Sequence, residues 1–86
     1  MSEIELTVNN DAGIHLQVAG KIVRALSPLK SNVMVIKGNM KLNAKSIIGL
    51  TGMAASKGTL LKFVADGEDE QTAIERLREL FESNFE

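Results

Sequence analysis

The only histidine among the 86 residues, His15, carries the side chain best suited to covalent chemistry. It follows Gly13-Ile14 and directly precedes a run whose apolar residues recur at helical spacing, so it falls at or next to the first position of a helix. The first N–H groups of a helix lack internal partners, and the helix dipole adds partial positive charge there. A neutral imidazole is nucleophilic near neutral pH, so His15 is a candidate acceptor for a phosphoryl group.

The oxygens of such a phosphohistidine would lie near the free amides of the helix start, those of Leu16, Gln17 and Val18. Lys21 lies four residues after Gln17 and shares its helix face, from which the ammonium could reach back toward His15. The alternative is an ordinary solvated histidine, which local sequence alone favours because lone histidines are common at protein surfaces.

The composition of the chain argues against several classes of function. A chain of 86 residues has room for one small core, hence a single domain over 1–86. One histidine and no cysteine argue against a metal centre or a disulfide framework, and we expect no cofactor. Ten basic and eleven acidic residues give a net charge of −1, and the only aromatic residues are three phenylalanines, which argues against direct binding of nucleic acid or insertion into a membrane. The acidic N-terminus and short apolar runs favour a soluble cytoplasmic protein.

The periodicity of apolar residues predicts a fold of class α+β. Strands are predicted over 4–8, 33–37, 40–43 and 59–65, and helices over 16–27 and 70–84. Gly38-Asn39 is typical of a tight turn between antiparallel strands, and Ser46 is the expected N-cap of a short helix limited by glycines. The acidic run 68–70 is interpreted as helix-start charge rather than as catalytic carboxylates. The order β-α-β-β-α-β-α favours a four-stranded antiparallel sheet covered on one face by three helices.

Three stretches resemble HPr, the histidine-containing phosphocarrier family of the bacterial phosphoenolpyruvate:sugar phosphotransferase system. They are Gly13-Ile14-His15, the segment Asn-Ala-Lys-Ser-Ile-Ile-Gly-Leu at 43–50 and the segment Ala-Asp-Gly-Glu-Asp-Glu at 65–70. They occur in the family's order and at its spacing, and the resemblance covers essentially the whole chain. It implies the open-faced β-sandwich of that family, in agreement with the predicted order of elements.

The resemblance also implies a role for individual residues. His15 would accept a phosphoryl group on Nδ1 from phosphorylated enzyme I and pass it to enzyme IIA domains. Ser46 would be phosphorylated by an ATP-dependent HPr kinase/phosphorylase, as in Gram-positive relatives. Leu16, Ile47 and Ile48 would form an apolar patch for docking partners. The chain would then be a carrier and not an enzyme, because the chemistry belongs to its partners.

The chain departs from the family pattern Gly-Leu-His-Ala-Arg-Pro-Ala directly after His15. Gln17 replaces the arginine, which removes a charge-assisted contact with phosphate of about 1.5–3 kcal/mol. Val18 replaces the proline and supplies one additional N–H. An alternative function is therefore a regulatory binding module that acts through Ser46 and a catabolite-control transcription factor, with weak or no phosphotransfer. Retention of His15 favours the carrier, and loss of the arginine favours the module.

Overall fold

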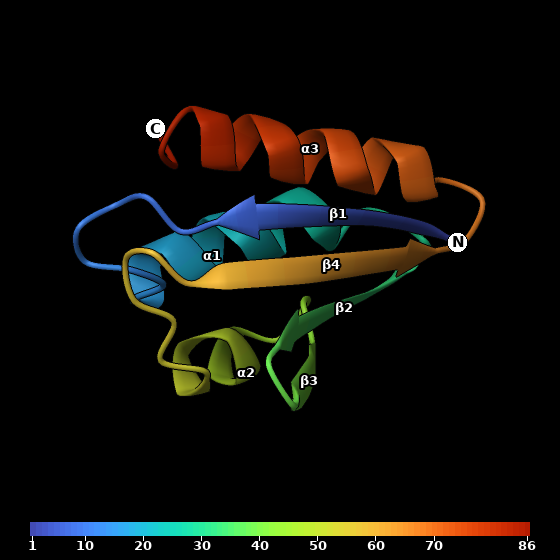
Figure 1. Cartoon of the computed structure of the whole chain (residues 1–86). Coiled ribbons are helices and arrows are strands. Elements are labelled where there is room, and N and C mark those ends of the chain that lie inside the picture. Colours follow the sequence, from blue (N-terminus) through green and yellow to red (C-terminus); the bar gives the residue numbers. More distant parts are fainter.

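The computed structural model describes residues 1–86 as a four-stranded antiparallel sheet with helices packed against one face (Figure 1). The strands are β1 (Ser2–Thr7), β2 (Asn32–Lys37), β3 (Met40–Asn43) and β4 (Leu60–Asp66). The helices are α1 (Leu16–Leu26), α2 (Ile47–Gly52) and α3 (Glu70–Glu82). The order β-α-β-β-α-β-α and the antiparallel sheet confirm the predicted fold class.

The strands lie in the order β1-β4-β2-β3, so β4 is central and pairs with both β1 and β2. A tight turn at Gly38, whose φ is +56°, joins β2 to β3 as the sequence predicts. The pairing register sets Ile4 opposite Phe63 and Phe63 opposite Val35, and these residues face the helices. Residues next to them in each strand face away, which is the alternation expected of a sheet with one covered face.

The hydrophobic core fills the space between the sheet and helices α1 and α3. Ile22 and Leu26 from α1 and Leu77 from α3 are fully buried there. The rings of Phe63 and Phe81 meet edge-on with centroids 5.7 Å apart, which joins β4 to α3. None of the helices has the length and apolar composition needed to cross a membrane.

Several element boundaries differ from the sequence prediction. β1 begins two residues earlier than predicted, β2 begins one residue earlier, and α1 ends one residue earlier, at Leu26. β1 ends before Val8, whose backbone bonds instead to the loop at Gly58 and Thr59. β4 runs one residue later than predicted, to Asp66. α3 ends at Glu82 rather than at 84 because the residues that follow turn into left-handed backbone, φ being +58° at Asn84 and +65° at Phe85.

Candidate functional site

His15 is the N-cap of α1. Its backbone is extended, with φ −92° and ψ −178°, and its Nδ1 accepts a hydrogen bond from the backbone N–H of Gln17 at 3.2 Å. This imidazole occupies the place that a Ser, Thr or Asp side chain usually takes at a helix start. The side chain is half-buried and its ring is fixed by a backbone group. The prediction that His15 lies at the first turn of a helix is confirmed.

The hydrogen bond to Gln17 determines which ring nitrogen is available for reaction. An acceptor nitrogen carries a lone pair, so the neutral ring holds its proton on Nε2 and the nucleophilic atom is Nδ1. A group added to Nδ1 would replace this hydrogen bond and would lie against the amides of Leu16, Gln17 and Val18, which the helix itself cannot satisfy. The Val18 side chain is buried in the core, a contact that the sequence prediction missed.

The loop before His15 is rigidly positioned. The side-chain amide of Asn10 donates to the carbonyl of Gly13 at 2.7 Å, and the backbone N–H of Ile14 donates to the carbonyl of Ala55 at 2.9 Å. Gly13 has φ +72°, and a Cβ at this position would lie 2.4 Å from the Ala55 oxygen. Only glycine therefore fits where the loop passes the 54–58 segment, which fixes the direction from which the chain enters α1.

An ion pair joins the same two segments at the surface. Lys57 Nζ lies 2.8 Å from Asp11 Oδ1. The hydrogen bond from Lys57 lowers the pKa of Asp11, and the same bond raises the pKa of Lys57. Both groups are exposed, so solvent screens the pair and it orients the loop more than it stabilises the fold.

A hollow of about 500 Å³ lies beside the helix start and combines several predicted site residues. The residues that line it come from α1 and from the first turn of α2, namely Leu16, Gln17, Gly20, Lys21, Arg24 and Ile47. Gln17 and Lys21, two of the predicted phosphate-binding residues, thus share one surface with Leu16 and Ile47 of the predicted docking patch, whereas Val18 and Ile48 do not line it.

The Lys21 ammonium has a hydrogen-bond partner that the sequence did not predict. It donates a hydrogen bond to the backbone carbonyl of Phe85, because the chain end lies against α1 at this level. A contact between Lys21 and a phosphate at His15 stays a prediction. Arg24 is the second cation of the hollow, and its spacing of seven residues from Gln17 places it on the same helix face.

Ser46 is the N-cap of α2, as predicted. Its hydroxyl oxygen accepts a hydrogen bond from the backbone N–H of Gly49 at 3.0 Å. Ile48 is 84% exposed and Leu16 67% exposed, whereas Ile47 is 38% exposed. Leu16 and Ile47 line the same hollow, and exposed apolar side chains that lie together are typical of a docking surface.

The acidic run before α3 is structural, in agreement with the sequence interpretation. Glu68 pairs with Lys30 at 3.2 Å, and Asp69 accepts hydrogen bonds from the loop at Lys30 and Ser31. Glu70 accepts from Gly67 and pairs with the N-terminal ammonium at 2.9 Å. Each carboxylate is thus engaged in holding a loop or a chain end.

Comparison with known proteins identifies the family to which this arrangement belongs. The family model of the PTS HPr component phosphorylation site matches residues 2–83. Phosphocarrier protein HPr of Xylella fastidiosa is 45% identical over 85 residues, which cover 99% of this chain and 96% of that protein. HPr-like protein Crh of Bacillus subtilis is 38% identical over 77 residues, 90% of this chain and 91% of that one.

A solved structure shares the whole architecture. The crystal structure of HPr-C-His from Thermoanaerobacter tengcongensis superposes with a TM-score of 0.94 at 39% identity and covers 99% of this chain and 96% of that one. The likeness therefore includes the helix start at His15 and every strand of the sheet. The chain belongs to the HPr family of phosphocarrier proteins of the phosphotransferase system.

Proposed function

We propose that this protein accepts a phosphoryl group on Nδ1 of His15 from phosphorylated enzyme I and passes it to enzyme IIA domains. The observation that carries the proposal is the hydrogen bond from the Gln17 N–H to His15 Nδ1. It directs the nucleophilic lone pair toward the anion-binding end of α1. The chain acts as a carrier and not as an enzyme on its own, since its partners supply donor, acceptor and general acid–base groups.

The transfer step balances without a cofactor. The Nδ1 lone pair forms the new bond to phosphorus as the bond between phosphorus and the donor atom of enzyme I breaks. His15 then holds the phosphoryl group on Nδ1 and the proton on Nε2, and the amides of Leu16, Gln17 and Val18 face the new oxygens. Transfer to an enzyme IIA domain reverses these changes and restores the neutral imidazole.

Incubation with enzyme I and phosphoenolpyruvate, followed by mass spectrometry at neutral pH, tests the proposal. We expect one phosphate on His15, and none in a His15→Gln control that retains a hydrogen-bonding side chain. Addition of an enzyme IIA domain should remove the label. A chain that remains unmodified under conditions in which an HPr with the family arginine is fully phosphorylated would refute the carrier function.

A second function, regulation through Ser46, is favoured by the surface next to this hydroxyl. The exposed side chain of Ile48 and the partly exposed Ile47 follow Ser46 directly, so a phosphate there would stand at the edge of an apolar docking surface. Similarity to the HPr-like protein Crh is compatible with such a role. In this alternative the phosphorylated chain binds a catabolite-control transcription factor, and His15 contributes weak or no phosphotransfer.

Incubation with HPr kinase/phosphorylase and ATP separates the two functions. Label on Ser46, abolished by Ser46→Ala, together with binding to the transcription factor only after labelling, would support regulation. Label on His15 alone would support the carrier. A chain labelled at both positions would act as a carrier under regulation, and the order of addition would show whether one phosphate prevents the other.

A further inference from the structure

The face of the sheet away from the helices has an ordered distribution of charge. Its residues follow from the pairing register, because directly opposed residues of antiparallel strands point to the same side. Two rows cross all four strands in the order β1, β4, β2, β3, and we call them together the open face. The first row is Glu3, Val64, Met34 and Asn43, and the second is Glu5, Lys62, Ile36 and Lys41.

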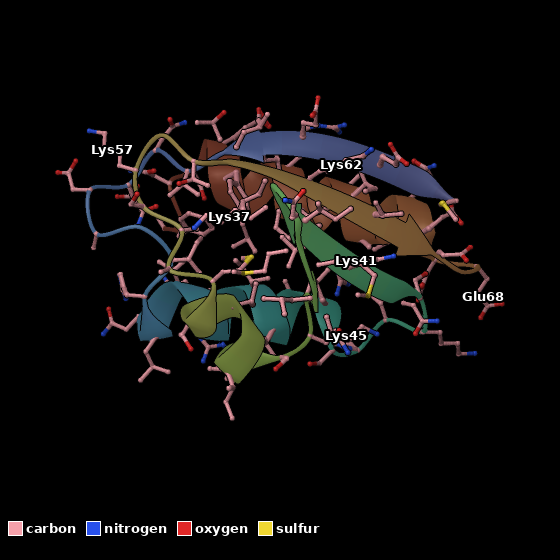
Figure 2. All side chains as sticks on the ribbon, turned by 60° about the horizontal axis from the view of Figure 1, so that its bottom comes forward. Lys37, Lys41, Lys45, Lys57, Lys62 and Glu68 are labelled. Atoms are coloured by element: carbon pink, nitrogen blue, oxygen red, sulfur yellow. The ribbon has the colours of Figure 1, made fainter.

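The charges at the two ends of the second row have no partner within the chain. Glu5 on β1 and Lys41 on β3 are both exposed, and neither takes part in a salt bridge or a side-chain hydrogen bond. Glu3, by contrast, is paired with Lys62 at 3.1 Å. Figure 2 shows Lys41 and Lys62 over different strands of the sheet. One edge of the open face thus carries a free carboxylate and the opposite edge a free ammonium.

Apolar side chains occupy the centre of the open face. Val64, Met34 and Ile36 lie on the inner strands β4 and β2 and are only half-buried, although no helix covers them. They contribute to a shallow hollow of about 470 Å³ that extends from Glu3 to Lys41. An apolar centre with charged edges is the usual composition of a protein interface.

We propose that the open face binds the open face of a second copy of this chain, around a two-fold axis parallel to the strands. This rotation places β1 of one copy over β3 of the other while each row stays at its own level. Glu5 of each copy then faces Lys41 of the other copy, so the symmetric contact contains two such ion pairs and leaves none of the four charges unpaired. In the first row Val64 faces Met34 of the second copy, which continues the apolar centre across the interface.

The other face-to-face arrangement is unfavourable. A two-fold axis perpendicular to the strands places β1 over β1, so the carboxylates of Glu3 and Glu5 meet those of the second copy. Like charges that face one another in an interface repel and disfavour the complex. The charge distribution therefore selects one orientation. The helices lie on the far side of the sheet, so His15 at the start of α1 stays accessible in both copies (Figure 1).

The size of the open face limits the strength of this contact. Four strands spaced about 4.8 Å apart and about six residues long cover roughly 400 Å² per copy, which is below the area of stable specific interfaces and corresponds to a weak, transient contact. We expect a dissociation constant on the order of 100 μM and a clear weakening at high salt, because the specific contacts are exposed ion pairs.

Charge reversal provides the test, with sedimentation equilibrium as the measurement. Glu5→Lys and Lys41→Glu should each weaken self-association by about tenfold or more, since each creates two like-charge contacts in a symmetric dimer. The double variant should associate like the original chain. An equimolar mixture of the two single variants should also associate, because every contact between them is complementary. Glu79→Lys on the exposed surface of α3 makes the same change in net charge as Glu5→Lys and should have no effect.

Rescue in the double variant cannot arise within one chain. Glu5 and Lys41 are separated by three strand spacings, about 14 Å, which exceeds the screening length of about 8 Å at physiological salt. A chain that stays monomeric at about 1 mM in low salt would overturn the proposal. A dimer that persists in both single variants would also overturn it, and would point instead to exchange of a terminal strand. The test is independent of phosphorylation at His15, so the proposed function stands or falls separately.

Discussion

Asp69 holds the buried Ser31 through two hydrogen bonds to one oxygen: Oδ1 accepts from the Ser31 backbone N–H at 2.9 Å and from its hydroxyl. The second carboxylate oxygen accepts the N–H of Lys30 at 2.8 Å. The loop between α1 and β2 is thereby fixed to the start of α3. Ser31 is the one fully buried polar side chain in the chain, and its hydroxyl is satisfied by a charged partner.

Stability should fall in acid because two carboxylates have depressed pKa values. The Ser31 hydroxyl and the Lys30 N–H lower the pKa of Asp69 to about 2, and the Ser2 hydroxyl and the N-terminal ammonium lower that of Glu70 to about 2. The two carboxylates contribute fully to the free energy of unfolding at pH values above their pKa in the unfolded chain. This contribution is lost between about pH 5 and pH 2, as pH falls through their pKa in the folded chain. Urea unfolding across this pH range should show the decline in the free energy of unfolding. The Asp69→Asn variant should show a weaker dependence of that free energy on pH.

Gly13→Ala should destabilise the fold by about 3 kcal/mol or more, because it combines left-handed backbone with a clash against the Ala55 carbonyl. Gly38→Ala is the matched control, since Gly38 also has positive φ but faces open space, and we expect a loss of about 1 kcal/mol. Thermal unfolding of both variants gives the comparison. Equal losses would show that the left-handed backbone alone accounts for the loss of stability and that the contact with the Ala55 carbonyl adds nothing.

Ala54→Gly should stabilise the protein by about 0.5–1 kcal/mol. Ala54 is exposed and has φ +54°, a conformation in which the β-carbon is unfavourable and glycine is not. The gain is smaller than the full strain because glycine also increases the entropy of the unfolded chain. A higher midpoint of urea unfolding, with an unchanged slope of the free energy of unfolding against urea concentration, would confirm the gain. A loss of stability would show that contacts of the alanine methyl hold the backbone in this conformation.

Gln17→Arg should lengthen the lifetime of phosphohistidine by about tenfold, since a guanidinium adds a charge-assisted hydrogen bond next to His15 Nδ1. The measurement is the hydrolysis rate of the phosphorylated protein at neutral pH, without partners. Thr72→Arg adds the same charge on the exposed surface of α3 and should leave the rate unchanged. An equal effect of both variants would assign the change to net charge rather than to a contact.

Lys21→Met should lower stability by about 1 kcal/mol, because the chain end loses its hydrogen bond to α1 while the apolar stem is preserved. Thermal unfolding and the phosphohistidine lifetime should be measured together. A shortened lifetime would show that the ammonium leaves the Phe85 carbonyl for the phosphate. An unchanged lifetime would restrict Lys21 to holding the C-terminus.

The elements that the sequence predicts best are those whose signals are local. The period of the strands, the turn at Gly38, the helix start next to His15 and the cap at Ser46 are indicated by neighbouring residues in the sequence, and all of them are confirmed. The hydrogen bond from the Lys21 ammonium to the Phe85 carbonyl was not predicted, because the two residues are 64 positions apart in the sequence. No local pattern reports such a contact.

The same limit applies to the loop before His15. The glycine at 13 indicated a turn, but the reason that only glycine fits is the carbonyl of Ala55, which tertiary packing brings close. The left-handed residues at the end of α3 were missed for a similar cause, since burial of Phe85 against Phe81, with ring centroids 4.7 Å apart, holds a backbone that its own sequence disfavours.

The central position of β4 has a consequence for how the protein is made. β1 is synthesised first but pairs only with β4, so its partner does not exist until more than two thirds of the chain has been translated. Closure of such a long loop is slow compared with the formation of the β2–β3 hairpin. Because Ala55, just before β4, holds the loop at Ile14, the final position of His15 depends on a segment that is synthesised late. A nascent or partly unfolded chain would therefore lack the ordered helix start at His15.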